Sequence, residues 1–430
     1  MSEESPVDPF LEIHPNIRKR FPQIEHDRDG NRRTYLNSGA GTLMVDSAIQ
    51  GLAEAAQSAN PQPGHIDPSE VATEELHWRV RQSVTDFIHG NRPEEISFHQ
   101  STTHALFNLA YSLRGMLTNL NNLVVTDLDH MANISPWEDV WGFGFGCEIR
   151  RAKVDEEGRL DVDHLLSLID QTTGVVAVTM ASNGFGSVVP LDEVIPLIRT
   201  KSYTALICVD AVHHALHGSI DVQKMDCDFL AFSGYKIFGP MLGVFWGKGS
   251  LLHRLQPYRV ETNKSEAPHK FEQGTLNNAT LASLEGALAY LLWLSDELAR
   301  RVGRKIQSAR NKFEFAMDRI ADYEGKLSRS VLECFQRFDA DRFRCFGIND
   351  PERIGERDPT FSFEISGKDP GEIKRYLWEV HGLQIADGNH YSAAIYRHLN
   401  RESLCRASFA HYDTLEAVKR FVEAVEDFLI

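Results

Sequence analysis

Short apolar runs recur through the middle of the chain, and segments with helical periodicity lie between several of them. The five runs are short and rich in apolar residues, as buried strands are, and they span 123–125, 175–178, 205–209, 229–232 and 242–246. Apolar residues at helical spacing occupy 165–169 and 194–198, between the earlier runs. Alternating strands and helices are typical of a sheet that is buried on both faces. The pattern predicts an α/β fold.

The last two runs stand too close together for a helix to connect them. Only residues 233–241 separate them, whereas a parallel pair of strands needs a crossover of about a dozen residues or more. We therefore expect one antiparallel or hairpin-joined strand in an otherwise parallel sheet. A helix over 71–88 is expected to precede the sheet, because Leu76, Val80 and Val84 recur at helical spacing.

Beyond residue 280 the pattern changes to one long helical stretch, predicted over 281–321. After it come an alternating strand over 361–365 and helices over 373–380 and 415–429, which indicates a smaller α+β lobe. A chain of 430 residues exceeds the size at which a single core stops growing. We predict an N-terminal arm, a large α/β domain, and a linking helix with a small C-terminal domain, over 1–45, 46–290 and 291–430.

The charge of the chain argues against polyanionic partners. A formal net charge of −16 disfavours binding to nucleic acid or anionic lipid. The six cysteines are dispersed without a Cys-x-x-Cys pair, as is usual for free thiols in a reducing compartment. No apolar stretch approaches the ~20 residues of a membrane helix, and residues 1–10 lack the basic start and apolar run of a signal peptide. We expect a cytoplasmic protein without nucleic-acid or membrane partners.

A lysine follows the fourth apolar run, inside the glycine-bounded turn Ser233–Pro240. Enzymes built on such sheets keep their chemistry at the ends of strands. Apolar neighbours such as Phe232 and Phe238 would disfavour the charged form of Lys236, which frees its amine to attack an aldehyde. The alternative is a surface lysine whose stem lies along apolar side chains.

A carboxylate ends the preceding run, because Asp210 follows Ala205–Val209 directly. A pyridoxal 5′-phosphate site needs a lysine that forms an imine and an acid that pairs with the pyridinium nitrogen. If the two strand ends converge, Lys236 and Asp210 supply both. Taken alone, Asp210 suits a helix cap or a loop carboxylate equally well.

Seven segments of this chain resemble, in the same order, motifs of fold-type I pyridoxal-phosphate enzymes of the aminotransferase class V family, particularly its cysteine desulfurase-like branch. They are Tyr35–Gly39, Ser101–Thr103, Asp129–Asn133, Ser182–Asn183, Val209–His213, Ser233–Lys236 and Phe271–Thr275. The resemblance spans most of the chain. It implies a mostly parallel central sheet with helices on both faces, the cofactor pyridoxal 5′-phosphate, and a homodimer with shared active sites.

The resemblance also implies roles residue by residue. Lys236 would carry the cofactor, Asp210 would pair with the pyridinium nitrogen, and His130 would stack on the cofactor ring. Thr102, Thr103 and Ser233 would hold the phosphate, and Asn183 and His213 would lie near the phenolic oxygen of the cofactor. Gly274 and Thr275 would reach the phosphate from the neighbouring subunit. Without the resemblance, capping of a helix over 105–113 explains Thr102 and Thr103 equally well, and the segment around Gly274 is a turn.

Two positions depart from the pattern of cysteine desulfurases. Tyr235 stands where those enzymes usually have a histidine, so one phosphate contact is altered or is made by the phenol. The loop 386–392, which in desulfurases carries the sulfur-accepting cysteine, contains Tyr391 and no cysteine. A tyrosine cannot form a persulfide, so the usual acceptor is missing from this loop. We expect Tyr391 to belong to the substrate site instead, where its phenol would shape the pocket or donate a proton.

A segment around Arg406 resembles the one whose arginine holds the α-carboxylate of the substrate. A guanidinium fork suits that group, although a surface ion pair also explains it. We expect an amino-acid substrate that reacts through an external aldimine. β-Elimination, including carbon–sulfur cleavage without persulfide storage, ranks before epimerisation and transamination. The alternative of another class is a catalytically idle dimeric scaffold.

A cluster of histidines follows Asp210 at helical spacing. His213, His214 and His217 form it, but no glutamate follows the first histidine as a metalloprotease requires. We therefore expect no metal in this protein.

Overall fold

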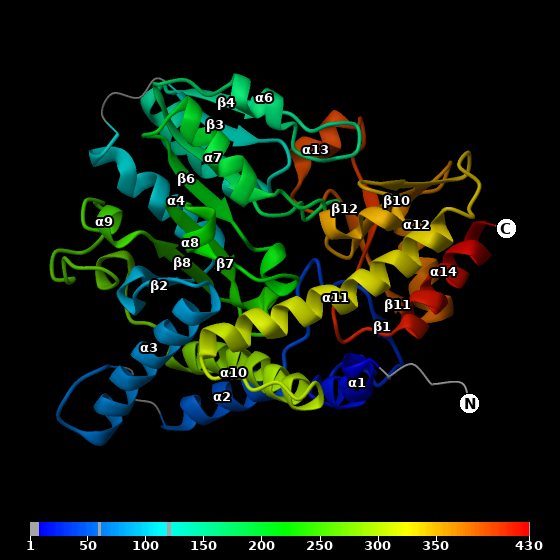
Figure 1. Ribbon diagram of the computed structural model, residues 1–430, viewed down its shortest axis with the longest axis horizontal. Helices are drawn as coiled ribbons and strands as arrows, with labels where there is room; N and C mark the ends of the chain where they lie inside the picture. Colours follow the sequence, from blue (N-terminus) through cyan, green and yellow to red (C-terminus); the bar gives the residue numbers. More distant parts are fainter. Residues whose placement is uncertain (1–7, 59–61, 118–121, 430) are drawn as a thin grey trace.

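The structure is a computed structural model that describes residues 8–58, 62–117 and 122–429. Its centre is a seven-stranded sheet of order β2-β8-β7-β6-β5-β3-β4 (Figure 1). The strands are β2 (Ile96–His99), β3 (Asn122–Thr126), β4 (Glu148–Ala152), β5 (Thr173–Thr179), β6 (Leu206–Asp210), β7 (Phe229–Ser233) and β8 (Gly243–Gly247). Neighbouring strands from β4 to β7 are parallel, and β8 is antiparallel to both β7 and β2. The predicted α/β class and the predicted reversed strand are confirmed.

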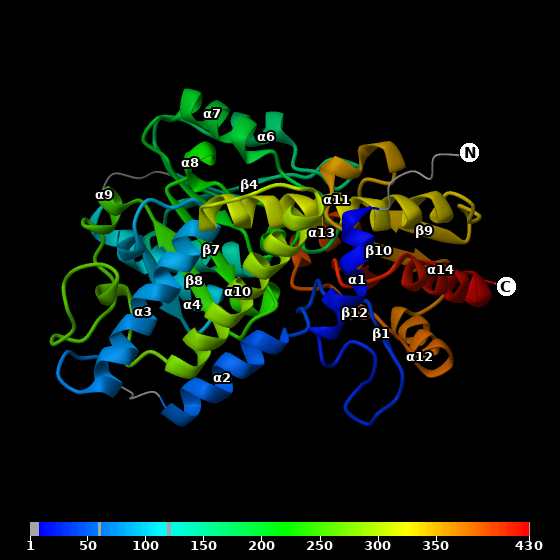
Figure 2. The same cartoon turned by 60° about the horizontal axis from the view of Figure 1, so that its bottom comes forward.

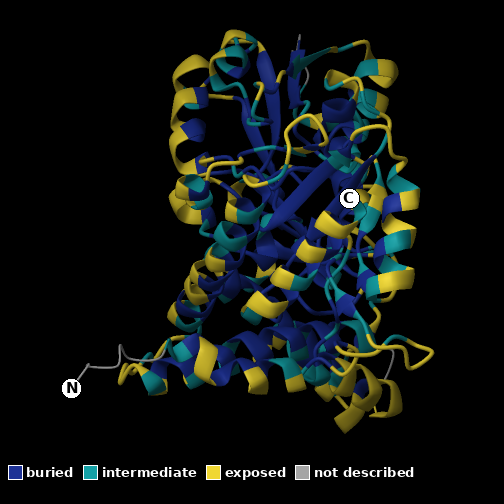
Figure 3. Ribbon diagram, turned by 90° about the vertical axis from the view of Figure 1, so that its right-hand side faces the viewer, coloured by how far each residue is buried: buried dark blue, intermediate teal, exposed yellow. Residues whose placement is uncertain are grey.

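Successive residues of the central strands enter two different cores, one on each face of the sheet. In β5, Val176 and Val178 belong to one core, and Val175 and Ala177 belong to the other. Figure 3 shows the inner strands in the colour of buried residues, between helices whose outer surfaces are exposed. The edge strand β4 is only partly buried. A sheet covered on both faces requires apolar residues at every position, which explains the unbroken apolar runs in the sequence.

Helices of the large lobe cover the two faces. The first core takes in residues of α3 (Pro68–Phe87), α7 (Leu191–Lys201) and α10 (Asn278–Arg301), and the second takes in residues of α4 (Thr102–Ser112) and α5 (Ser135–Trp137). The remaining α-helices of this part are α1 (Pro9–Lys19), α2 (Asp46–Ser58), α6 (Val162–Ser167), α8 (Val222–Met225) and α9 (Gly249–Leu252). α2 lies alongside α10 below the sheet in Figure 1.

The C-terminal part of the chain forms a second, smaller sheet of order β12-β13-β10-β9, antiparallel throughout. Its strands are β9 (Phe343–Phe346), β10 (Thr360–Ile365), β12 (Ala386–Gly388) and β13 (Leu404–Ser408), and β1 (Thr34–Tyr35) pairs in parallel with β11 (Leu383–Gln384). Its helices are α11 (Ala309–Phe335), α12 (Pro370–His381), α13 (Ala393–His398) and α14 (Leu415–Leu429). Figure 2 shows α11 running from the large lobe into this smaller one. The predicted domain boundaries stay predictions, and the one at residue 290 falls inside α10.

The prediction of a single helix over 281–321 is wrong. α10 ends at Arg301, and Gly303 adopts a left-handed φ of +64° just beyond it, a conformation that glycine reaches at little cost. Ser308 then caps α11 by accepting a hydrogen bond from the Asn311 amide. The sequence patterns also do not predict β2 and β4. β4 is an edge strand that carries charged residues, so it shows no apolar alternation.

The described residues settle two further points. None of their helices has both the length and the apolar character that spanning a membrane demands. All six cysteines are present as free thiols.

A methyl group at Gly243 is predicted to destabilise the large lobe. An alanine Cβ there would lie 2.3 Å from the carbonyl carbon of Ser101 and 2.6 Å from the amide nitrogen of Thr102. Because backbone cannot move aside as a flexible side chain can, Gly243→Ala should lower the free energy of unfolding by about 1–3 kcal/mol, measured by chemical denaturation. The control is Gly355→Ala, whose Cβ would meet nothing within 4 Å. Equal unfolding midpoints for the two variants would contradict the close packing of β8 on the start of α4.

Candidate active site

The carboxyl ends of the central parallel strands open into a cavity of about 950 Å³. Thr179, Asp210 and Ser233, the last residues of β5, β6 and β7, lie on its wall. The small lobe closes it with Arg406 of β13 and with the loop 386–391. Ligands of open α/β sheets bind in the crevice outside the carboxyl ends of the strands. The position of the cavity therefore marks it as the candidate active site.

Lys236 lies in the wall of this cavity, in the turn η6 (Gly234–Lys236) that follows β7. Its side chain is buried, with 4% of the residue exposed, and its Nζ donates a hydrogen bond to the Gly39 carbonyl. Burial and then the Arg406 guanidinium lower the pKa of Lys236 to about 7, although Asp210 acts in the opposite direction. An amine that is partly neutral near pH 7 can act as a nucleophile or as a base.

Asp210 lies on the same wall and is also buried. Its Oδ1 accepts a hydrogen bond of 2.8 Å from the Val212 amide. Burial raises the pKa of Asp210 to about 6, against the lowering effects of that hydrogen bond and of Lys236. Because a cationic partner would restore its charge, the carboxylate suits a protonated ring nitrogen. The structure brings Lys236 and Asp210 to one cavity, as the sequence suggested.

One end of the cavity is lined by the start of helix α4. Thr102 and Thr103 belong to the first turn of α4 rather than preceding it, and Ser101 is the N-cap, whose Oγ accepts from the His104 amide at 3.1 Å. Thr102 Oγ1 donates to the Phe232 carbonyl at 2.8 Å and lies 2.7 Å from Ser233 Oγ. Helix N-termini with hydroxyl side chains bind phosphate and other anions. This end of the cavity therefore suits a phosphate group.

His130 and Tyr391 form an aromatic pair on the cavity wall. Their rings stack with centroids 5.4 Å apart and an interplanar angle of 29°. The Ala132 amide donates to His130 Nδ1 at 3.0 Å, and the Met131 amide donates to the Tyr391 carbonyl at 2.9 Å. Burial, and then the charge of Lys236, lower the pKa of His130 to about 4. His130 is therefore a neutral ring that is available for stacking.

Arg406 reaches the cavity from the small sheet and is 2% exposed. Its Nη1 donates to the Asn183 carbonyl at 2.7 Å, while its Nε has no hydrogen-bond partner among the described residues. Burial lowers the pKa of Arg406 to about 10, so the guanidinium stays charged at neutral pH. A buried cation with an unused donor suits an anionic ligand such as a carboxylate.

Asn183 joins Arg406 to the loop that closes the cavity. Its side-chain amide donates to the His390 carbonyl at 2.7 Å, and its Oδ1 accepts from Ser392 Oγ at 2.5 Å. The sequence placed Asn183 near the phenolic oxygen of a cofactor. The structure keeps it on the cavity wall but uses both ends of its amide to hold the loop.

His213 and Tyr235 complete the set of predicted residues on the wall. His213 is 2% exposed, and neither of its ring nitrogens has a hydrogen-bond partner in the described parts of the chain. Burial holds the pKa of His213 well below its ordinary value, and burial raises the pKa of Tyr235. Since an unsatisfied buried imidazole is costly, His213 fits a polar ligand in the cavity.

Gly274 and Thr275 are not among the residues that line the cavity of their own chain. The segment is anchored just before them, where Arg81 Nη2 donates to both Glu272 carboxylate oxygens at 2.7 Å and the Phe98 amide donates to Glu272 Oε1 at 3.0 Å. A contribution from these residues to the site of a second subunit stays a prediction.

Sequence reasoning missed several residues of the wall: Phe107, Ser135, Thr179, Asn389 and His390. Two of them carried a signal. Thr179 ends an apolar run as Asp210 does, and Phe107 lies one helical turn beyond Thr103. Ser135 begins the three-residue helix α5, and Asn389 and His390 lie on a loop; segments this short carry no periodicity.

Residues 34–421 match the aminotransferase class-V family. The chain belongs to this family. A class-V relative, the cysteine desulfurase of Pectobacterium carotovorum subsp. carotovorum (strain PC1), is 30% identical over 428 residues, 95% of this chain and 96% of that protein. Among solved structures, the apo cysteine desulfurase of Thermococcus onnurineus NA1 superposes with a TM-score of 0.83 at 23% identity, covering 96% of this chain and 98% of that one. A cysteine desulfurase of Escherichia coli gives 0.79 at 23% identity, covering 98% of both chains.

Class-V enzymes are fold-type I enzymes that use pyridoxal 5′-phosphate, and the predicted family and fold are confirmed. The cavity fits that cofactor on its own chemistry. It combines an amine, a buried carboxylate, a helix N-terminus and an imidazole with two unpartnered nitrogens.

Borohydride reduction in the presence of pyridoxal 5′-phosphate is expected to label Lys236, because its buried amine has a lowered pKa and lines the cavity. Lys270 is the matched comparison, since it is also buried with a lowered pKa but donates to the Leu255 carbonyl. Peptide mass spectrometry should find the label in Lys270→Arg and lose it in Lys236→Ala. A label on Lys270, or one that survives Lys236→Ala, would contradict the assignment.

Proposed function

We propose that this class-V enzyme removes a β-substituent from an amino acid, with carbon–sulfur cleavage as its principal reaction, and does not store sulfur as a protein persulfide. The observation that carries this proposal is the position of the thiols. All six cysteines lie in described parts of the chain, and none is among the residues lining the cavity. Cys405 precedes Arg406, yet its Sγ lies 3.4 Å from the Pro370 carbonyl, and burial raises the pKa of its thiol. A thiol that does not ionise is a poor sulfur acceptor.

The residues of the cavity would divide the binding of pyridoxal 5′-phosphate among them. When bound, this cofactor supplies an electron sink for a negative charge at the substrate Cα. The Lys236 amine would hold the cofactor, and Asp210 would keep a proton on the ring nitrogen. Thr102, Thr103 and Ser233 would hold the phosphate beside the start of α4.

Arg406 would bind the α-carboxylate of the substrate. Its guanidinium offers paired donors, so two hydrogen bonds would fix the orientation of the substrate as well as its affinity. The Asn183 carbonyl holds one edge of the guanidinium at 2.7 Å, which limits the directions that the fork can take. A fixed carboxylate determines which bond at Cα is broken.

Proton transfer at Cα would fall to Lys236, whose pKa of about 7 allows its amine to accept and return a proton at neutral pH. The leaving group on Cβ needs a proton as it departs. Tyr391 would shape the pocket or donate that proton, because its ring stacks on His130 and its residue lines the cavity.

Epimerisation and transamination begin with the same proton transfer and stay the alternatives within this class. The names of the relatives, cysteine desulfurases, favour a sulfur-containing amino acid over other substrates. An idle scaffold would have no need for Lys236, Asp210 and Arg406 in one buried cavity, since buried charges are costly to keep. A homodimer and a cytoplasmic location complete the proposal.

The test of the reaction supplies the cofactor-loaded enzyme with cysteine and with cysteine S-conjugates. We expect a thiol or sulfide, ammonia and a 2-oxo acid in equal amounts, and mass spectrometry should find no persulfide on any of the six cysteines. Lys236→Ala is the inactive control. A persulfide that forms at the rate of turnover, or alanine as the carbon product, would show desulfurase chemistry instead.

Mixing variants tests the shared site. If Thr275 binds the phosphate in the site of the neighbouring subunit, the inactive variants Thr275→Asp and Lys236→Ala should complement each other after exchange of subunits. About half of the dimers are then mixed, and one of the two sites in each mixed dimer is intact. The mixture should therefore regain about a quarter of wild-type activity. The matched control mixes Lys236→Ala with Asp210→Asn, two residues of the same cavity, and should regain none. Recovery in neither mixture, or a monomer in sedimentation, would contradict sharing.

A further inference from the structure

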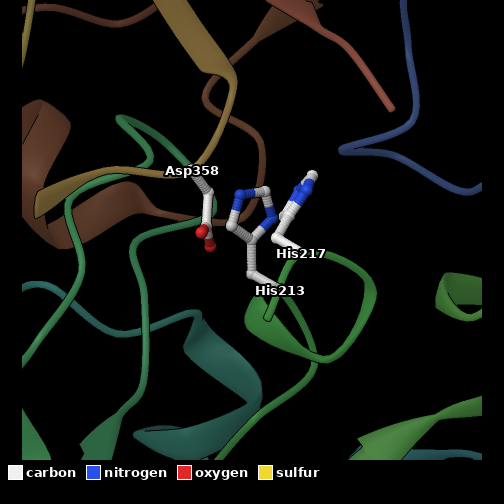
Figure 4. Close-up of side chains that lie close together, drawn as sticks. All are labelled: His213, His217 and Asp358. Carbon is white, nitrogen blue, oxygen red and sulfur yellow. The ribbon is translucent and has the colours of Figure 1, made fainter. Parts of the chain in front are cut away.

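A chain of buried polar groups leads away from the cavity behind His213. Figure 4 shows the His213 ring between the side chains of Asp358 and His217. His217 follows at the end of the short helix η5 (His214–Leu216), and its ring centroid lies 5.2 Å from that of His213. Asp358 precedes β10 in the small lobe. The cavity is thus backed by ionisable groups that the proposed reaction does not use.

His217 is held by a carboxylate from the small lobe. Its Nδ1 lies 2.7 Å from Oε2 of Glu324 in α11, and both residues are 2% exposed. The other ring nitrogen, Nε2, is buried without a partner in the described residues. A buried histidine–carboxylate pair that is neutral overall holds one proton between Nδ1 and Oε2 and a second proton on Nε2. That second proton makes Nε2–H a donor.

That donor lies close to His213. One ring nitrogen of each histidine and one Asp358 oxygen lie within 4.8 Å of one another, so a small ring rotation or one bridging water would join the two imidazoles. His214 Nδ1 lies 3.2 Å from both Asp358 oxygens, which ties Asp358 to the turn on which His213 lies. A hydrogen bond accepted from His217 would leave His213 with its N–H toward the cavity.

His213, His217 and Asp358 have side chains of the kinds that bind metals. The positive charge around them, however, disfavours a divalent cation. Lys236 and Arg406 both act on His213, and with His217 and His214 they help burial to hold its pKa down. Two buried cations beside His213 would repel a divalent metal ion as they repel a proton. The ionisable groups that surround His213, His217 and Glu324 come from several elements. His214 lies on the same short helix, and the others are Lys236, Arg406, Asp358, His411, Asp413 and Tyr323.

We propose that His217 and Glu324 are positioning residues, which fix the tautomer of His213 so that it presents an N–H donor to the phenolic oxygen of the bound cofactor. The inference rests on the proposed cofactor site and adds two residues that do not line the cavity. It also gives the small lobe a role beyond substrate binding, because α11 supplies the carboxylate at the far end of the chain.

The test titrates the visible absorption of the cofactor-loaded protein against pH. In Glu324→Gln the side-chain carbonyl of the new glutamine accepts from Nδ1–H of a neutral His217, so Nε2 becomes an acceptor and His213 turns its N–H away from the cavity. The oxygen then loses a donor, holds its negative charge less well, and the chromophore keeps its proton to higher pH. We expect the pH midpoint of the absorption change to rise by about half a pH unit or more.

Two further variants make the outcome specific. His217→Gln should raise the midpoint in the same way, and the double variant should shift it no further than the larger single shift, since both act through one chain. Glu95→Gln is the matched control, because Glu95 is a buried glutamate that accepts from Trp246 Nε1 at 2.9 Å and does not line the cavity. It should lower stability without moving the midpoint.

The possible failures are distinguishable. A wild-type protein that binds no pyridoxal phosphate would overturn the proposed function and this inference with it. A loaded protein whose midpoint is unmoved by Glu324→Gln and His217→Gln, while both lose stability as Glu95→Gln does, would overturn this inference alone. About one equivalent of bound metal in the wild type that is lost in His217→Gln would also overturn it, in favour of a metal site.

Discussion

The structure is organised around two cations and one carboxylate that share a single buried cavity. Lys236 and Arg406 are 4% and 2% exposed, burial lowers the pKa of both, and the Arg406 guanidinium lowers the pKa of Lys236 further. Burial of charge is tolerated only where hydrogen bonds and opposite charges replace water. The Gly39 and Asn183 carbonyls and the Asp210 carboxylate supply part of that replacement. An anionic ligand would supply the rest, so the buried Lys236 and Arg406 side chains favour an anion as the ligand of this cavity.

Neither lobe could create this environment alone. The large sheet supplies Lys236, Asp210 and the start of α4 at one edge, because parallel strands end on the same side. The small sheet supplies Arg406 and the loop that covers the opening. Polar contacts join the two parts, from the Asn183 amide to the His390 carbonyl at the cavity and from His217 to Glu324 behind it. The geometry of the site therefore depends on how the lobes meet.

Within this framework the proposed reaction depends on the segment that covers the cavity. The residues proposed to hold the cofactor and the carboxylate lie on strands, on the start of α4 and on the turns that follow strands, in a chain of the aminotransferase class-V family. The loop 386–392 carries Tyr391 stacked on His130, with no thiol in reach. If the proposed reaction is right, this short segment distinguishes it from other reactions of the same fold, because function depends on the site more than on the fold.

The sequence by itself determined the α/β class and the reversed strand, because both rest on local periodicity and on the spacing of the strands. It also suggested that Lys236 and Asp210 could meet, and the tertiary structure brings both to one cavity because β6 and β7 are parallel neighbours. It did not reveal the break at Gly303 within the predicted helix or the charged edge strand β4, where no apolar pattern marks the element. Only the tertiary structure joined His217 to Glu324, 107 residues away, and turned Asn183 into the link between Arg406 and the loop. Such contacts join residues that are distant in the chain, and they form only when two lobes have packed together.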